Sequence, residues 1–367
     1  MTTRPQCSYA LRPKPQHNIQ TDVKIYRFPT SRNSTTRSLS TTGPVNTTTK
    51  TTTLSDSVKL RHYLAPRYWP TWLALGMMRL VALLPLRLIE LCGSLLGKLL
   101  YIALPERRRV ADINLRIAFP DASDEKIIRM RKQCFRNLGI AAFELALSWW
   151  HDQRLLKICE VEGLEHIRQL QAQGRGVIIL TAHFTCLEIG GPVINHSVPF
   201  QVMYKRAHNP LFDLFMRHHR ARLYRAIVDH HKPMAMIKGL KKGHAAWYAP
   251  DQDFRGKDMI YLPFFGVQAS ALTAPARFAE MTNAAVVPYY IMRKPKGQGY
   301  KLTILPPLEN FPCGDIETDA RMINQTLEQL IMQNPDQYLW IHKRYKNRPP
   351  GEPPVYPKKN KKRKGDA

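Results

Sequence analysis

The sequence predicts an α/β fold, a largely parallel sheet flanked by helices, with an N-terminal membrane-anchoring helix. Short runs rich in Val, Ile and Tyr alternate along residues 105–348 with stretches of helical periodicity. This alternation is typical of strands joined by helices that cover both faces of a parallel sheet. An apolar segment precedes this body at residues 69–104, and polar, basic tails stand at both ends of the chain.

The net charge of the chain indicates which binding partners it favours. The 367 residues include 55 Lys and Arg and 28 Asp and Glu, a net charge of +27. The first 57 residues carry +6 of this charge and the last ten carry +5, so the residues between them keep +16. A body this basic favours polyanions, meaning nucleic acid, anionic lipid head groups or an acidic carrier protein. The six Cys show no C-x-x-C spacing, so neither a disulfide framework nor a zinc site is expected.

Residues 1–57 form a basic tail rich in Thr and Ser, and we expect it to be disordered because it lacks hydrophobic periodicity. A transit peptide has a similar composition, poor in acids and rich in Ser and Arg. An overcalled translation start is the explanation that we favour. The next Met, Met77, lies inside the apolar segment, so a true start near residues 54–60 would use a non-Met codon.

Residues 58–104 are expected to form a membrane-associated helical segment. Charged residues interrupt it at Arg79, Arg87, Glu90 and Lys98. No uncharged run therefore reaches the roughly 18 to 20 residues that cross a bilayer. Trp69 and Trp72 resemble an interfacial aromatic belt, and Arg67 is placed to reach the head groups. A short tilted span and a helix lying in the interface both fit this pattern, and a buried core helix is the third alternative.

The body extends over residues 105–348 as an α/β domain, and residues 349–367 are expected to form a loose basic tail rich in Pro and Lys. Strands are predicted at 176–180, 200–204, 245–249, 285–292 and 300–305. Helices are predicted at 107–119, 124–150, 162–173, 210–226, 232–242 and 318–333, with Ser123 as the N-cap of the second.

The most informative stretch is residues 176–191. A strand runs to Leu180, His183 follows just past its end, and Glu188 falls on the first turns of a helix that begins after it. Ligands of open α/β sheets gather at the carboxyl ends of the strands. His183 is therefore placed where chemistry is expected.

A His and a Glu at this spacing suit acyl transfer from a thioester to a hydroxyl. An imidazole, with an ordinary pKa of about 6.5, takes the proton of the attacking alcohol, and a carboxylate on its other nitrogen fixes the tautomer. A thiolate leaves without a strong acid. The nucleophile belongs to the substrate, so Cys186, among apolar neighbours, is interpreted as a packing thiol. The spacing alone, however, is common by chance.

The sequence lacks the motifs that mark several other classes of enzyme. The motifs H-E-x-x-H, G-x-S-x-G and G-x-x-x-x-G-K-[ST] are absent from the sequence. The His pairs 218–219 and 230–231 have no neighbours at the spacing of metal ligands. No metal and no organic cofactor is expected.

The sequence blocks from His183 onward are more specific evidence of function than the spacing of His183 and Glu188 alone. They are His183-Phe-x-x-x-Glu188, Tyr204-Lys-Arg-Ala-His-Asn-Pro210-Leu-Phe-Asp213, Gly239-Leu-Lys-Lys-Gly243, Trp247-Tyr-Ala-Pro-Asp251-Gln-Asp253, Leu262-Pro-Phe-Phe265 and Tyr338-Leu-Trp-Ile-His-Lys-Arg-Tyr-Lys346. With these blocks in this order, the chain resembles the lipid A late acyltransferases, the Kdo-dependent lauroyl and myristoyl transferases of the lysophospholipid acyltransferase superfamily. The likeness covers roughly residues 58–356.

This resemblance implies a role for each candidate catalytic residue. His183 is implied to be the general base and Glu188 the carboxylate that orients it. Asp251 falls at the family's essential acid in Ala-Pro-Asp and is expected to face the same crevice. The alternative for Asp251 is a helix cap or a structural partner of an Arg.

The resemblance also implies residues that bind the substrate. Arg220 falls where the family has an essential basic residue, and a fixed guanidinium suits a lipid phosphate or an oxyanion. Lys205 and Arg206 are further candidates to meet phosphate, although many relatives have Pro in place of Arg206. The run from Trp340 to Lys346 is either a phosphate site or a packed final strand with a solvated face.

The implied function is transfer of a fatty acyl group from acyl carrier protein to a hydroxyl of a Kdo-bearing lipid A precursor, in lipopolysaccharide biosynthesis. Lauroyl is the default acyl group and myristoyl remains open. The basic body suits an acidic carrier and an anionic glycolipid. The location implied is the cytoplasmic face of the inner membrane, where basic segments favour the anionic leaflet. No nucleic-acid partner is expected.

Three other functions are alternatives for this sequence. A glycerolipid acyltransferase of the lysophosphatidate type usually has Asp in place of Glu188 and a Pro-Glu-Gly-Thr block, which the sequence lacks. A nucleic-acid-binding basic protein accounts for the charge but not for the apolar segment at 69–104. An inactive membrane scaffold would show no acyl transfer at all.

Overall fold

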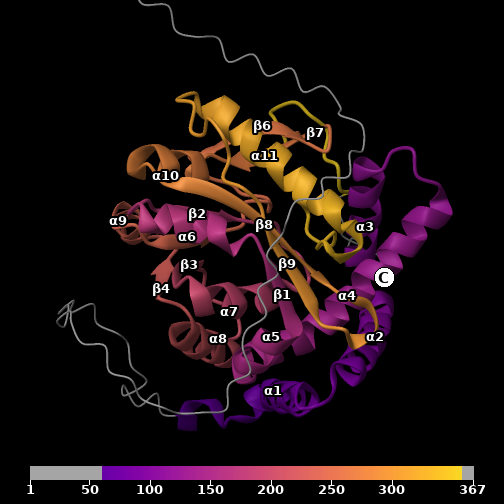
Figure 1. Ribbon diagram of the computed structural model, residues 1–367. Helices are drawn as coiled ribbons and strands as arrows, with labels where there is room; N and C mark the ends of the chain where they lie inside the picture. Colours follow the sequence, from indigo (N-terminus) through magenta and orange to yellow (C-terminus); the bar gives the residue numbers. More distant parts are fainter. Residues whose placement is uncertain (1–59, 358–367) are drawn as a thin grey trace, which may run out of the picture.

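A seven-stranded sheet occupies the centre of the computed structural model, which describes residues 60–357, and its strand order is β1-β9-β8-β2-β5-β3-β4 (Figure 1). The strands are β1 (Cys159–Glu162), β2 (Val177–Leu180), β3 (Phe200–Tyr204), β4 (Ala226–Asp229), β5 (Ala245–Tyr248), β8 (Ala285–Arg293) and β9 (Tyr300–Ile304). The strands from β8 to β4 run parallel, β9 is antiparallel to β8, and β1 is parallel to β9. The predicted α/β fold with a largely parallel sheet is confirmed.

Helices flank this sheet. They are α1 (Trp69–Ala82), α2 (Leu86–Ala103), α3 (Pro105–Ala118), α4 (Asp124–Trp150), α5 (Asp152–Ile158), α6 (Leu164–Ala172), α7 (Leu187–Ser197), α8 (Pro210–Leu223), α9 (Met234–Lys241), α10 (Ala274–Thr282) and α11 (Ile316–Gln333). A separate hairpin pairs β6 (Met259–Phe264) with β7 (Val267–Leu272). Helices α10 and α11 lie near this hairpin, and α2, α3 and α4 lie along the right edge of the view (Figure 1).

Several of these elements were not expected from the sequence. Strands β1 and β4 have four residues each and lie at the two edges of the sheet. Short edge strands with charged residues give little apolar signal. The turn of the hairpin holds Phe265 and Gly266 at positive φ, 47° and 77°. Since a bulky residue rarely adopts this conformation, no turn motif marks the hairpin.

A buried ionic network fixes the segment that passes under the carboxyl edge of the sheet. Glu144 of α4 forms a two-pronged ion pair with Arg293 of β8, at N···O distances of 2.5 and 2.6 Å. Gln337 accepts from the Arg293 N–H and donates to the Arg293 carbonyl, at 2.8 and 3.0 Å. Tyr300 also donates to Glu144, at 2.8 Å. Buried charges are tolerated when they are paired in this way. Through Gln337, the network ties the segment after α11 to β8.

Helices α1 and α2 lie along α4 and turn their remaining faces outward (Figure 1). Leu75 and Ala82 of α1 and Ile89 of α2 are buried. Within residues 60–357, no helix taken alone has both the length and the apolar composition needed to cross a membrane. Helices α2 and α3 meet these limits only as a pair, and they join at a bend of 96°.

The C-terminal segment, expected to be loose from residue 349, is packed over its first part. Tyr356 is buried, donates to Asn114 Oδ1 at 2.6 Å and accepts from the Tyr345 N–H at 3.2 Å. The burial and two hydrogen bonds of Tyr356 hold this part of the chain on the body, although its Pro-rich composition suggested a loose tail. The expected tails at residues 1–57 and 358–367 lie outside the described residues.

Candidate active site

His183 lies three residues beyond β2, where the chain turns into α7 at the carboxyl edge of the sheet. Its backbone N–H donates to Asp251 Oδ2 at 3.0 Å, and its Nδ1 lies 2.6 Å from Asp251 Oδ1. Asp251 follows β5, which pairs with β2 in parallel. The adjacency of these two strands therefore brings together two residues that are far apart in the sequence.

The carboxylate of Asp251 is fully buried. Burial raises its pKa, but the His183 imidazole, the two hydrogen bonds from His183 and the hydrogen bond from Tyr338 outweigh burial and hold the pKa at about 2. Tyr338 donates its hydroxyl to Oδ2 at 2.9 Å. Asp251 is thus ionised across the physiological range.

The ionised Asp251 settles the tautomer of His183. A carboxylate only accepts hydrogen bonds, so Nδ1 carries the proton and Nε2 is left with its lone pair. Burial lowers the pKa of His183, but the charge of Asp251 and its hydrogen bond outweigh burial and raise the pKa above its usual value. The side chain is 29% exposed, and Nε2 has no hydrogen-bond partner within residues 60–357. The imidazole can therefore accept a proton from a bound molecule.

Glu188, which the resemblance implied as the carboxylate that orients His183, does not contact the imidazole in the structure. It lies in the first turn of α7, where its carboxylate accepts from Arg220 Nη2 of α8 at 2.6 Å. Nδ1 of His183 is already occupied by Asp251. Glu188 acts on His183 only through its charge, which adds to the rise in the His183 pKa.

A small pocket, open to solvent, is lined in part by the ion pair between Glu188 and Arg220. Its other walls are mainly apolar and come from Leu187, Phe200, Val202, Met203, Tyr224 and Trp247. Arg220 and Glu188 are partly exposed, at 20% and 31% of their side chains. The pocket thus brings a charged pair next to mainly apolar walls.

Lys205 and Arg206 lie on the exposed loop after β3, at the same edge of the sheet. Neither forms an ion pair with another residue of the described range 60–357. Asp213 shapes this loop by accepting from the Tyr204 hydroxyl at 2.5 Å and from the Ala207 N–H at 2.8 Å. The two cations therefore remain available to an anionic ligand.

The run from Trp340 to Lys346 is a series of turns rather than a strand. Trp340, Arg344 and Tyr345 are buried. Arg344 donates to the Ser270 carbonyl at 2.6 Å and lies 4.6 Å from the centre of the Phe264 ring. The cation at position 344 thus packs into the body and is not part of a solvated face.

Some contributors to the site were not expected from the sequence. Tyr338 bonds to Asp251, and Gly191, Tyr224 and Trp247 line the pocket. Tyr338 and Trp247 stand at the heads of two of the blocks shared with the acyltransferases, and this was the available signal. No sequence motif marks Gly191 or Tyr224, because the contact between them depends on how α7 packs against the end of α8.

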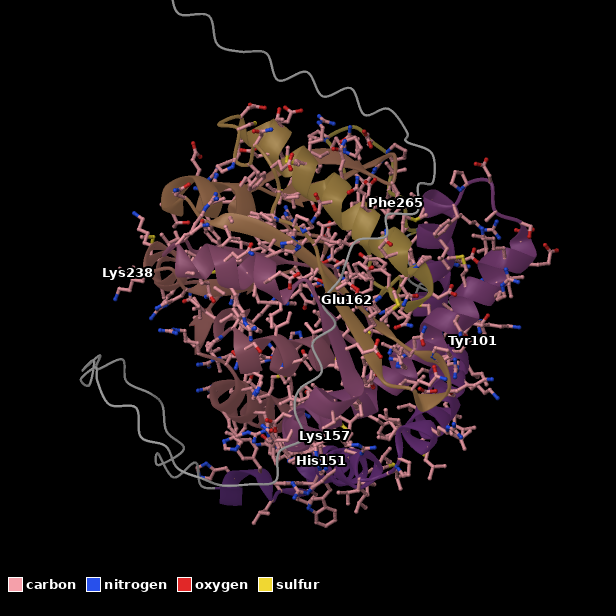
Figure 2. The ribbon with its side chains drawn as sticks, viewed as in Figure 1. Tyr101, His151, Lys157, Glu162, Lys238 and Phe265 are labelled. Atoms are coloured by element: carbon pink, nitrogen blue, oxygen red, sulfur yellow. The ribbon has the colours of Figure 1, made fainter. Side chains whose placement is uncertain are left out.

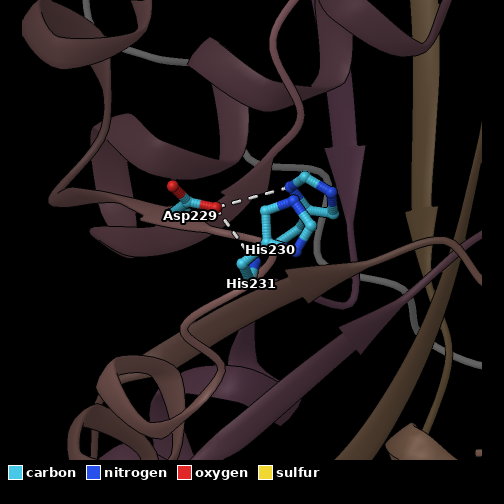
Figure 3. A group of neighbouring side chains, drawn as sticks. All are labelled: Asp229, His230 and His231. Carbon is cyan, nitrogen blue, oxygen red and sulfur yellow. Dashed lines mark hydrogen bonds and ion pairs between the residues drawn. The ribbon is translucent and has the colours of Figure 1, made fainter.

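Asp229, His230 and His231, at the end of the edge strand β4, have ligand atoms within 4.8 Å of one another (Figure 3). From the sequence, no partner at the spacing of metal ligands was expected for this His pair. Asp229 Oδ1 lies 3.4 Å from His230 Nδ1 and accepts from the His231 N–H at 2.9 Å. These contacts among consecutive residues account for the closeness of the group without an ion.

Comparisons with known proteins identify a family that this chain matches. The family model described as bacterial lipid A biosynthesis acyltransferase matches residues 57–347. The chain is 39% identical over 295 residues to the lipid A biosynthesis lauroyltransferase of Escherichia coli (strain K12), covering 80% of this chain and 96% of that protein. It is 36% identical over 298 residues to the palmitoleoyltransferase (81% and 97%) and 28% identical over 300 residues to the myristoyltransferase (80% and 92%) of the same organism.

Proposed function

Because the chain belongs to the family of bacterial lipid A biosynthesis acyltransferases, we propose that it moves a fatty acyl group from an acyl carrier protein thioester to a hydroxyl of a Kdo-bearing lipid A precursor. The observation that carries this proposal is the imidazole of His183, held by the buried carboxylate of Asp251, near a pocket with mainly apolar walls.

In the proposed reaction, the acceptor hydroxyl attacks the thioester carbonyl carbon while His183 Nε2 takes the hydroxyl proton. Asp251 keeps the proton on Nδ1 and stabilises the imidazolium that forms. The tetrahedral intermediate then collapses, the C–S bond breaks, and the imidazolium returns the proton to the departing thiolate. The products are the acylated acceptor and the free carrier thiol, so atoms and charge balance without a further reactant.

We assign the polar end of the substrates to the cations around the pocket. Arg220, fixed by Glu188 at 2.6 Å, is placed to bind a phosphate or the developing oxyanion. Lys205 and Arg206 would meet a phosphate of the acceptor from the exposed loop. Glu188 would act as a positioning residue that holds the guanidinium in place.

We further propose that the acyl chain of the thioester occupies the pocket and that Gly191 and Tyr224 limit its length. A Cβ added at Gly191 would lie 2.2 Å from the Tyr224 hydroxyl oxygen and 3.1 Å from the carbon that bears it. At that distance one of the two residues must shift, and because both line the pocket, the shift should change its shape.

Gly191→Ala should therefore favour shorter acyl chains. We expect kcat/KM for the preferred chain to fall about tenfold or more relative to a chain two carbons shorter, because a single methylene in an apolar pocket is worth about 1 to 3 kcal/mol. The measurement is a competition among carrier thioesters of different lengths. Adding Tyr224→Phe to Gly191→Ala should restore the original preference.

Gly190→Ala serves as the matched control. A Cβ there would meet the ends of Leu302, Ile291 and Tyr289 at 3.3 to 3.5 Å and would not reach Tyr224. An unchanged length preference in Gly191→Ala, or an equal shift in both variants, would show that the chain does not occupy this pocket.

We propose that residues 58–104 associate with the cytoplasmic face of the inner membrane and that residues 105–348 form the acyltransferase domain. Large apolar side chains of α1 and α2 point away from the body, which supports a membrane contact. The excess of Lys and Arg suits both the anionic leaflet and an acidic carrier protein.

The proposed reaction can be tested by incubating the purified protein with a Kdo-bearing lipid A precursor and a panel of acyl carrier thioesters, followed by mass spectrometry of the lipids. We expect a mass increase of one acyl group on the precursor. Lysophosphatidate serves as the alternative acceptor in parallel. Acylation of lysophosphatidate alone would overturn the proposal in favour of a glycerolipid acyltransferase.

A further inference from the structure

We propose that α1 and α2 hold the protein in the plane of the membrane interface, with their outward apolar face in one leaflet and the active-site rim at the level of the head groups. This deepens the proposed function, on which it rests for the membrane-bound acceptor. The sequence left a tilted span and an interfacial helix as alternatives, and the packing of the two helices favours the second.

The first observation is an apolar stripe on the outer face of the two helices. It consists of Trp69, Leu73, Met77, Leu80, Leu83, Leu88, Leu91, Leu95, Leu99 and Ile102, whose side chains are between 44% and 73% exposed. Their spacing of three to five residues keeps them on one side of α1 and α2. With 14 and 18 residues, the helices are about 21 and 27 Å long, so the stripe is larger than a soluble surface usually carries.

The second observation is that the opposite face is seated on the body. Gly93 and Gly97 of α2 meet Gly139 of α4 so closely that a Cβ added at Gly139 would lie 2.2 Å from the Gly93 carbonyl oxygen and 2.3 Å from the Gly97 nitrogen. Farther along α2, Tyr101, labelled in Figure 2, contributes a further contact. Its ring packs edge-on against Phe135 of α4, with ring centres 5.3 Å apart.

These contacts fix the direction of α2. The helix lies against α4 from Gly93 to Tyr101, and α4 in turn packs on α7, which follows His183. A helix fixed along its length to the body presents its outer face parallel to the body surface. The layer that covers the stripe must therefore be tangential to the protein, as the surface of a bilayer is.

The third observation is the charge beside the stripe. Between residues 62 and 109 there are seven Lys and Arg and two Glu. Both acids are engaged toward the body, since Glu90 accepts from the Gly297 N–H at 2.9 Å and Glu106 pairs with Lys343 at 2.8 Å. Arg67, Arg87, Lys98, Arg107 and Arg109 are exposed. Apolar residues flanked by exposed cations complement an anionic leaflet, whereas a second copy of this face would bring like charges together.

The fourth observation links the stripe to the active site. Asn209, the N-cap of α8, donates to Thr71 Oγ1 of α1 at 2.8 Å, and Trp72 packs against Phe215 of α8 at 5.6 Å. Helix α8 carries Arg220, and the loop before it carries the exposed cations at 205 and 206. An acceptor lipid lying beside α1 would thus present its head group to this loop.

The test places two Glu on the stripe, Leu80→Glu with Leu95→Glu, in the full chain. Binding is measured by flotation with vesicles of phosphatidylethanolamine and phosphatidylglycerol. We expect the partition coefficient to fall at least about tenfold, because charges replace two exposed Leu that would enter the bilayer. Ile128→Glu, on α4 and off the stripe, is the matched control and should bind as the unmodified protein does.

Activity on acceptor dispersed in detergent separates this inference from the proposed function. The double variant should keep activity within about threefold there, which also shows that it folds. Undiminished flotation of the double variant would overturn the membrane role of the stripe. If light scattering shows that the unmodified protein is a dimer and the double variant is not, while flotation is unchanged, the stripe binds a second copy of the chain. This result would also overturn its membrane role.

Depth measurements distinguish lying in the interface from crossing the bilayer. Spin labels are attached at Leu73→Cys or Leu95→Cys after Cys7, Cys92 and Cys313 are replaced by Ser. We expect both labels at the same shallow depth, about 5 to 10 Å below the head groups. One label near the bilayer centre with the other at an interface would contradict the inference.

Discussion

Replacement of His183 by Ala should lower kcat/KM for acyl transfer by about a thousandfold or more. General-base catalysis contributes on the order of a hundred- to ten-thousandfold, and no other group is placed to take the proton of the acceptor. The imidazole is the only one bonded to an ionised, buried carboxylate within residues 60–357. The rate of transfer from carrier thioester to lipid acceptor, followed by mass spectrometry, checks this result.

His218→Gln is the control for this variant. His218 is exposed on α8, close to Arg220 in sequence, and the proposed reaction does not use it. It should retain activity within about twofold, because surface substitutions of this kind change little. The His183→Ala variant should still float with vesicles. Near-normal turnover in this variant would remove His183 as the base.

Asp251→Asn should produce the second large loss, between about a hundredfold and ten-thousandfold in kcat. The amide has nearly the shape of the carboxylate, but it cannot stabilise an imidazolium and can donate to Nδ1, which would place the proton on Nε2. The Tyr338 hydroxyl, which now donates to Oδ2 at 2.9 Å, would keep a partner. Single-turnover transfer from a preformed carrier thioester measures the chemical step directly.

Glu188→Gln gives the contrast. It weakens the contact with Arg220 but leaves the Nδ1 hydrogen bond of His183 intact. We therefore expect its main effect in KM for the acceptor, with a smaller loss of kcat than in Asp251→Asn. A larger loss of kcat in Glu188→Gln would restore the orienting role that the sequence had implied for Glu188.

The fold was predictable to the extent that its elements carry periodic signals. The buried run before His183 and the helix capped by Ser123 lie where the sequence places them. The edge strands and the hairpin around Phe265 carry no such signal, since short polar strands and a turn with a bulky residue at positive φ are uncommon.

The site was predictable in its residues but not in its pairing. His183 and Glu188 are five residues apart, which suggested a direct contact, whereas the partner of the imidazole is 68 residues away. That contact requires β5 to insert between β2 and β3, and strand order is not encoded in local periodicity. The direction of Glu188 depends on the residue at which α7 begins, and one residue of difference turns a side chain by about 100°.

The pH dependence of kcat/KM in the unmodified protein and in Asp251→Asn tests the central claim most directly. The base must be unprotonated to act, and Asp251 raises the pKa of His183. Activity should therefore decline on acidification at a pH above the usual pKa of His. Removing the Asp251 charge lowers that pKa, so the decline should move to lower pH in Asp251→Asn, although its activity is weaker throughout. An unchanged position of this decline in Asp251→Asn would contradict the assignment of His183, held by Asp251, as the base.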